Sequence, residues 1–139
     1  MNKEDYIDYR KQRAKESLSA AEVLMNAGNF YSAVNRIYYA LFYTIEALLL
    51  IRDLSSSKHG GVRSFFNRHF VKTGKVSIEI GELYNEMFEF RQKSDYGDYI
   101  HFDKEDIYSW LSKSKSYISE LDQLIDKELN NPDDAGEKS

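Results

Sequence analysis

The sequence predicts an all-α protein, an up-and-down four-helix bundle with an additional shorter helix. Apolar residues recur at helical spacing through most of the chain. The 139 residues include only seven glycines and one proline, and Pro132 lies in the polar C-terminal run, so little interrupts long helices before it. A chain of this length, 42% hydrophobic, suits one domain with one core. We therefore expect one bundle over residues 1–130 and a disordered polar tail over residues 131–139.

The stretch 30–51 is predicted to be the central helix, because two of its faces are apolar and both need neighbours. One face holds Ala33, Ile37, Ala40, Leu41, Thr44 and Leu48, and the other holds Tyr38, Phe42, Ile45 and Leu49. A membrane span competes for so apolar a run. However, Asn35, Arg36 and Glu46 would be costly in hydrocarbon, and its tyrosines are spread along the stretch. We expect a buried helix of a soluble protein without a membrane contact.

The residues before this helix predict an amphipathic partner over residues 3–27. Its apolar positions are Ile7, Ala14, Leu18, Ala21 and Met25, and charged residues occupy much of the rest. Gly28 and Asn29 supply a stop. Because this break is short, the two long helices are expected to lie antiparallel.

The residues after the central helix predict a turn-rich loop and then a short helix. Residues 54–61 read LSSSKHGG, and Ser56 or Ser57 could cap the helix that follows. That helix would bury Val62, Phe65, Phe66 and either His69 or Phe70. Residues 72–75 are expected to form another loop.

Two more long helices complete the bundle. The first runs from about 76 to 94, with Val76, Ile80, Leu83, Met87 and Arg91 on one stripe and Tyr84 and Phe88 beside it. The second begins after Asp103, which is expected to cap it, and runs to about 130. Its core positions alternate steps of four and three: Ile107, Leu111, Ser114, Ile118, Leu121 and Ile125.

A local positive patch lies between Asp53 and Glu79, where no acidic residue occurs, although the net charge of the chain is -4. We name five of its residues the basic segment: Lys58, His59, Arg63, Arg68 and Lys72. These are candidates to bind a nucleotide phosphate or RNA. The competing interpretation is a solvated helix face with a chance bias of charge.

A second candidate site begins at Arg91, which ends an apolar stripe and is followed by Asp95, Tyr96, Tyr99 and His101. Arginine can hold a phosphate bidentately, tyrosine or histidine can move a proton, and aspartate can orient either. Arg91, Asp95, Tyr96 and His101 are therefore the catalytic candidates, and Arg91 is also a binding candidate. The competing interpretation is a helix-terminal ion pair with tyrosines packed at the end of the bundle.

Other classes of site lack their residues. The chain has no cysteine, so a disulfide, a thiolate nucleophile and a zinc-thiolate site are excluded. It has no Glu-x-x-His pair and no Gly-x-Ser-x-Gly elbow. We expect no metal and no cofactor. The charged start has no apolar signal region behind it, which favours a cytoplasmic location.

Three stretches resemble the HEPN superfamily: FYSAVNRIYYALFY at 30–43, KHGGVRSFF at 58–66 and RQKSDYGD at 91–98. The resemblance covers most of residues 5–129 and is greatest to the small stand-alone prokaryotic members. It implies a helical bundle, frequent homodimers and association with minimal nucleotidyltransferase partners in toxin-antitoxin pairs. Several HEPN proteins are metal-independent RNases that use an Arg followed after four to six residues by a His, with two copies meeting across the dimer.

This chain departs from that pattern. Arg91 matches the Arg and His101 comes too late, and where the His is expected the chain has Ser94, Asp95, Tyr96, Gly97 and Asp98. The leading hypothesis is a homodimeric HEPN-like protein that binds a nucleotide or RNA and works with a nucleotidyltransferase. The alternatives are an active endoribonuclease toxin and a structural dimer without catalysis.

Overall fold

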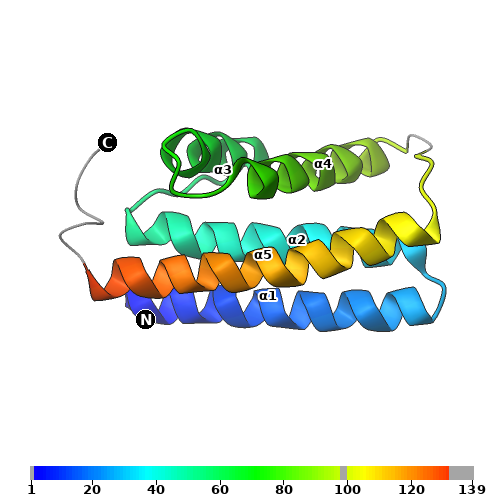
Figure 1. The fold of residues 1–139 in the computed structure, drawn as a ribbon, viewed down its shortest axis with the longest axis horizontal. Coiled ribbons are helices and arrows are strands. Elements are labelled where there is room, and N and C mark those ends of the chain that lie inside the picture. Colours follow the sequence, from blue (N-terminus) through cyan, green and yellow to red (C-terminus); the bar gives the residue numbers. More distant parts are fainter. Residues whose placement is uncertain (1, 98–99, 132–139) are drawn as a thin grey trace.

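The computed structural model describes residues 2–97 and 100–131, and this part of the chain is helical with no strand. The elements in order are α1 (Lys3–Asn26), α2 (Phe30–Ile51), α3 (His59–Phe66), the π-helical segment η1 (Asn67–Val71), α4 (Ile78–Asp95) and α5 (Lys104–Asn130). Figure 1 shows four long helices with α3 and η1 as the shorter addition. The predicted all-α bundle is confirmed.

The central position of α2 follows from its neighbours. It packs against α1, α3, α4 and α5, and each long helix runs antiparallel to the next one in the chain. As a result α2 and α5 run in the same direction, and they also pack side by side. In Figure 1 α1 lies on one side of this pair and the layer of α3 and α4 lies on the other.

The burial of α2 matches the two predicted apolar faces. All ten positions named for those faces are buried. Within the described residues, α2 is also the one helix long and apolar enough to cross a membrane. Core helices of soluble proteins share this length and composition, and here the neighbouring helices cover most of α2.

The first residues of α1, α4 and α5 are fixed by side-chain caps, whereas Asn29 before α2 makes no side-chain capping bond. Asn2 and Asp5 cap each other's backbone N–H groups at the start of α1, with bonds of 2.9 and 3.2 Å. Asp103 and Asp106 do the same for α5 at 2.9 and 3.0 Å, which confirms the predicted cap. Ser77 caps α4 by accepting from the Ile80 backbone N–H, and the helix begins at Ile78, two residues later than the predicted start.

The start of α3 corrects one prediction. Neither Ser56 nor Ser57 is the N-cap; Lys58 is, and it makes no side-chain capping bond. The Ser56 Oγ instead accepts from the Lys58 backbone N–H at 3.1 Å. This turn brings the chain so close that a Cβ at position 61 would lie 2.1 Å from the Ser56 Oγ, so Gly61 is required.

Helix α5 is the last helix of the bundle, and its six predicted core positions are all buried. Asn131 follows it and donates from its side-chain amide to the Lys127 carbonyl at 3.0 Å. The rest of the predicted tail, residues 132–139, lies outside the described residues.

Candidate functional site

The candidate site is built around Tyr38 of α2, which is fully buried. Its ring stacks on Tyr84 of α4, with centroids 5.9 Å apart and planes inclined by 8°. On its own helix it stacks with Phe42 at 5.8 Å, and Phe42 in turn stacks on His59 of α3 at 4.4 Å. We call these four residues the Tyr38 cluster; it joins three helices at one point.

The polar centre of the cluster is a hydrogen bond between the Tyr38 hydroxyl and Nδ1 of His59, 2.6 Å long. Which group donates depends on the tautomer of the imidazole. Because α3 begins at His59, the tight turn at Gly61 places this ring against α2. The histidine of the basic segment therefore belongs to an aromatic cluster.

Arg91 reaches the same tyrosine from α4. Its Cζ lies 5.3 Å from the centre of the Tyr38 ring, and its Nη1 donates to Oδ2 of Asp95 at 2.8 Å. The predicted Arg91–Asp95 pair is thus confirmed as a contact. The Arg91 side chain is 16% exposed and that of Asp95 58%, so the guanidinium is largely covered while its partner carboxylate faces water.

Two polar atoms at this point, on side chains within hydrogen-bonding reach of Tyr38, make no hydrogen bond of good geometry within the described residues. They are the buried hydroxyl of Tyr84 and the buried Nε of Arg91. Buried donors are normally satisfied, so an unpaired one calls for an explanation such as a bound ligand or water. Neither atom is open to solvent, so a ligand can reach this point only through the exposed part of the Arg91 side chain.

Burial also sets the protonation states. It raises the pKa of Tyr38 to about 12 and raises that of Tyr84 even more. Burial, assisted by the nearby positive charge of Arg91, lowers the pKa of His59 below its usual value. At neutral pH the site therefore offers neutral hydroxyls, a neutral imidazole and one cation, Arg91. This set suits the binding of an anion, and a neutral imidazole can accept a proton.

The other residues of the second predicted site lie elsewhere. Tyr96 is 79% exposed, and within the described residues its side chain makes no hydrogen bond or ring contact, while its backbone N–H donates to carbonyls of the last turn of α4. His101 is exposed in a loop whose neighbouring Ile100 carbonyl accepts from the Tyr31 hydroxyl at 2.7 Å. Tyr31 precedes Tyr38 by about two helical turns. The loop that holds His101 is therefore attached roughly 10 Å along α2 from Tyr38. Tyr99 lies outside the described residues.

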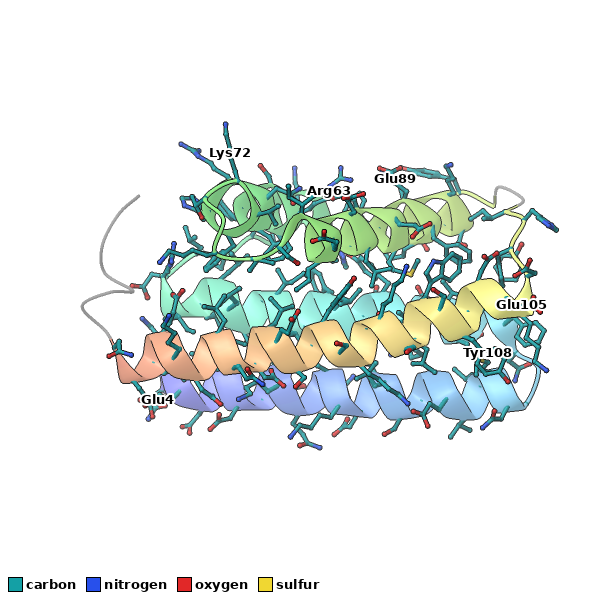
Figure 2. All side chains as sticks on the ribbon, viewed as in Figure 1. Glu4, Arg63, Lys72, Glu89, Glu105 and Tyr108 are labelled. Carbon is teal, nitrogen blue, oxygen red and sulfur yellow. The ribbon has the colours of Figure 1, made fainter. Side chains whose placement is uncertain are left out.

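The basic segment divides in the structure. Lys58, Arg68 and Lys72 are exposed. Arg63 instead lies with its Cζ 3.8 Å from the centre of the Phe88 ring and pairs with Glu89 at 3.1 Å. Figure 2 shows Arg63, Lys72 and Glu89 along the outer side of the α3 and α4 layer. The charges of Lys58, Arg68 and Lys72 therefore face solvent, where an anion could approach them. The charge of Arg63 is instead compensated by Glu89.

The sequence predicted that Tyr38 and Tyr84 lie in the core, but it did not predict that their hydroxyls form part of a polar site. The available signal was chemical: each stands at a buried position where phenylalanine would pack equally well, and a buried hydroxyl needs a partner. The link between His59 and Arg91 had no signal in the sequence, because the two residues belong to different helices.

No three His, Asp or Glu side chains of the described ranges are grouped as metal ligands. A hollow of about 380 Å³ between α4 and α5 is lined by Glu79, Glu82 and Glu86 and by Lys113 and Tyr117. The glutamates line one side of the hollow without gathering around a point.

Comparison with known proteins gives independent evidence on the family of this chain. The model of the HEPN domain family matches residues 7–127. A UPF0332 protein of Thermotoga maritima is 48% identical over 124 residues, which are 89% of this chain and 94% of the relative. A Methanocaldococcus jannaschii protein named "Putative toxin" is 37% identical over 114 residues, 77% of this chain and 78% of the relative. A UPF0332 protein of Gloeobacter violaceus is 35% identical over 107 residues, 76% of this chain and 85% of the relative.

Proposed function

The chain belongs to the HEPN family, and from that premise we propose that it binds a phosphate group of a nucleotide or RNA at Arg91, as the toxin-like member of a two-protein system. The observation that carries the proposal is the state of Arg91. Its guanidinium is held between Tyr38 and Asp95, and within the described residues Asp95 is its one ion-pair partner, through Nη1 alone.

This geometry supports phosphate recognition for a physical reason. A guanidinium offers five N–H donors in a rigid fork that matches a phosphate. Asp95 takes one of these donors and holds the group in place. Because the stem is covered and the ring of Tyr38 lies against the guanidinium, little side-chain freedom remains to be lost when an anion binds. The exposed Lys58, Arg68 and Lys72 would add attraction at longer range.

The proposed partners are a second copy of the chain and a minimal nucleotidyltransferase, and the proposed location is the cytoplasm. The relatives named as toxins support a paired system. Exposed aromatic side chains such as Tyr9 and Tyr96 support a shared surface between copies, since a chain that is 14% aromatic leaves several rings in water. A monomer in sedimentation at tens of micromolar contradicts the dimer.

A second candidate function is a metal-independent endoribonuclease, and one observation favours it. Although the expected histidine after Arg91 is absent, His59 contacts the same Tyr38 that Arg91 covers. The two residue types of the family's RNase motif therefore lie at one site, the histidine coming from α3. RNA cleavage that disappears in His59→Gln and persists in His101→Gln supports this candidate. If neither binding nor cleavage is found, a structural dimer without catalysis is left.

The direct test of the phosphate site is a titration of uridine monophosphate and of short RNA into the wild-type protein and three variants. Arg91→Ala is expected to lose binding, because it removes the donors. Arg91→Lys keeps the charge but loses the fork, and is expected to bind more weakly than wild type. Lys127→Ala removes an exposed positive charge from α5 and serves as the control. Unchanged affinity in Arg91→Ala refutes the proposal.

A further inference from the structure

A row of arginine-on-tyrosine contacts follows the seam between α1 and α2. In each, an arginine Cζ lies over a tyrosine ring. The pairs and their distances are Arg36 over Tyr39 at 4.8 Å, Arg13 over Tyr43 at 5.5 Å and Arg10 over Tyr6 at 5.9 Å. We call these six residues the Arg–Tyr strip; none of them belongs to the Arg91 site.

The strip is a consequence of helix geometry. Residues 36, 39 and 43 recur at steps of three and four, so they share one side of α2. Residues 6, 10 and 13 do the same on α1, which runs antiparallel to α2 and packs along it. Seven residues of helix rise by about 10 Å, so from 36 to 43 the strip spans more than one nucleotide of an extended strand.

The strip is partly accessible, with Arg36, Tyr39 and Tyr43 half-buried, and it is positive at one end. Arg36 has no ion-pair partner within the described residues. Arg13 pairs with Glu16 at 3.0 Å, but both side chains stay well exposed, at 38% and 51%. Arg10 pairs with Glu46 at 3.5 Å, and that contact is more buried. The positive potential therefore falls from Arg36 toward Arg10.

The positive end of the strip meets the Arg91 site. The Tyr39 ring lies edge-on to Tyr38 at 5.1 Å and edge-on to His59 at 5.9 Å. A ligand held at Arg91 and His59 would therefore lead directly onto Tyr39 and its covering Arg36. This continuity connects a phosphate site to a surface of stacked aromatic and guanidinium planes.

We propose that the Arg–Tyr strip is a binding track for a single strand of nucleic acid. Bases stack on aromatic rings and on guanidinium planes, and guanidinium N–H groups bind phosphates, so each pair can hold one nucleotide without reading its sequence. The proposal rests on the function proposed for Arg91 and deepens it, because it makes the ligand a polynucleotide of several residues instead of a free nucleotide.

A protein partner fits this surface less well. Its Tyr39 and Tyr43 rings are already covered on one side by arginines, so they offer no bare apolar face on that side. Anchors of protein interfaces enter desolvated apolar pockets. The hollow nearest to the strip, lined by Arg10, Glu46 and Leu50, has room for about 10 Å³ and admits no side chain.

The test measures affinity against length for oligouridylates of one to about nine nucleotides, a range typical of single-strand sites. Affinity of the wild-type protein is expected to rise with length until the strip is filled. The double variant Arg13→Gln/Arg36→Gln removes two guanidiniums of the strip, of which that of Arg36 is half-buried. It is expected to weaken the longest oligomer by about tenfold or more and to leave uridine monophosphate binding unchanged.

Lys104 over Tyr108 on α5 offers a matched control, because it is a cation-over-tyrosine pair 6.0 Å apart, outside the strip. Lys104→Gln/Tyr108→Leu is expected to bind every oligomer as wild type does. Tyr43→Leu, which removes one ring from the strip without changing charge, separates stacking from electrostatics and should also weaken only the longer oligomers.

Three outcomes overturn the track. Oligomers that bind no more tightly than the mononucleotide exclude it, and so does a strip variant with wild-type affinity for all lengths. A strip variant whose sedimentation shifts from dimer to monomer identifies the surface as a protein interface. The two proposals fail separately: loss of length dependence rejects the strip alone, whereas mononucleotide binding retained in Arg91→Ala rejects the phosphate site alone.

Discussion

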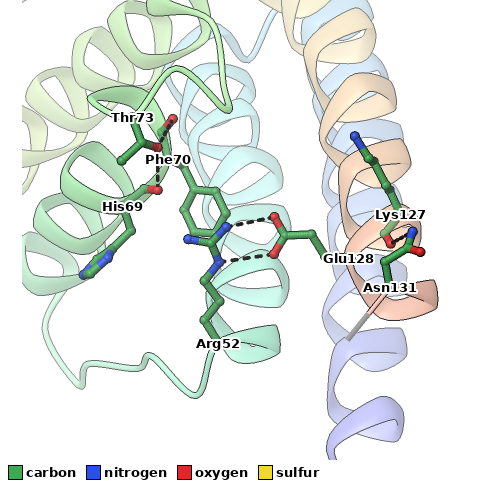
Figure 3. A network of polar contacts seen from close by, with 7 residues as sticks. All are labelled: Arg52, His69, Phe70, Thr73, Lys127, Glu128 and Asn131. Atoms are coloured by element: carbon green, nitrogen blue, oxygen red, sulfur yellow. Dashed lines mark hydrogen bonds and ion pairs between the residues drawn. The ribbon is translucent and has the colours of Figure 1, made fainter. Parts of the chain in front are cut away.

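Arg52 and Glu128 stand 76 residues apart in the sequence and form a buried, two-point ion pair that ties the end of α2 to the end of α5. Nε and Nη2 of the arginine donate to the two carboxylate oxygens at 3.2 and 3.1 Å. The side chains are only 7% and 5% exposed, and the guanidinium lies 4.3 Å from the centre of the Phe70 ring. Figure 3 shows the pair bridging α2 and α5 beside η1.

The first prediction is that Glu128→Ala destabilises the protein by about 3 to 5 kcal/mol, because it leaves the Arg52 charge buried and unpaired. Urea unfolding measures the change. The double variant Arg52→Met/Glu128→Met removes both charges and is expected to recover most of this loss, since a buried pair replaced by apolar groups of similar size is often neutral. A double variant as unstable as the single one would show that the pair itself supplies the stability.

The second prediction separates binding from stability at Arg91. Because Asp95 is well exposed, its ion pair adds less than about 1 kcal/mol, and the contact with Tyr38 adds about 0.5 to 1 kcal/mol. Arg91→Ala is therefore expected to lower the free energy of unfolding by at most about 2 kcal/mol, and less if the freed Nε was unsatisfied. Asp95→Ala should cost less still. A larger loss in Arg91→Ala assigns the residue to structure.

The third prediction concerns the exposed part of the basic segment. If Arg68 and Lys72 attract RNA phosphates, log affinity should fall steeply with log salt between about 50 and about 200 mM, and Arg68→Glu/Lys72→Glu should reduce that slope by about 1.4, or about 0.7 for each lost contact. Arg63 is left out, because its pair with Glu89 would be broken.

The control for the basic segment is Lys104→Glu/Lys127→Glu on α5, which makes the same change of net charge. A slope reduced equally by both double variants indicates an effect of net charge alone. An affinity of the wild-type protein that does not change with salt makes the basic segment a solvated face.

The fourth prediction is a pH dependence that comes from His59. Its pKa is lower in the folded protein than in the unfolded chain, because burial and Arg91 oppose its charge. Between these two pKa values the unfolded chain binds a proton that the folded protein does not. Stability should therefore fall as pH drops from about 7.5 to about 5, by at most about 1.4 kcal/mol per pH unit.

The His59 contribution is isolated by comparison with His59→Asn. The Asp95 carboxylate opposes the shift at His59, and the half-buried Glu46 and Asp122 have raised pKa values that act with the opposite sign in more acid solution. All of these remain in the variant, so the difference between the two urea series reports His59. Equal slopes for variant and wild type contradict the assignment.

How far the sequence predicts this protein depends on the kind of feature. The helices were predictable because a helical period repeats every few residues: the six core positions of α5 and both apolar faces of α2 are buried as expected. The Arg91–Asp95 pair was predictable for the same reason, since its members stand one turn apart. The N-cap of α3 was not predictable from the sequence, because it depends on how the loop before Gly61 folds back.

The sequence by itself therefore determined the helices, their order, the buried faces and the family resemblance, all of which lie within continuous stretches of the chain. Only the tertiary structure decided that His59 meets Tyr38 beneath Arg91, and that Arg52 finds Glu128. The physical reason is that such meetings depend on the rotation and offset of packed helices and on the path of the loops between them. Those quantities are set by packing over the whole core, and no local period in the sequence encodes them.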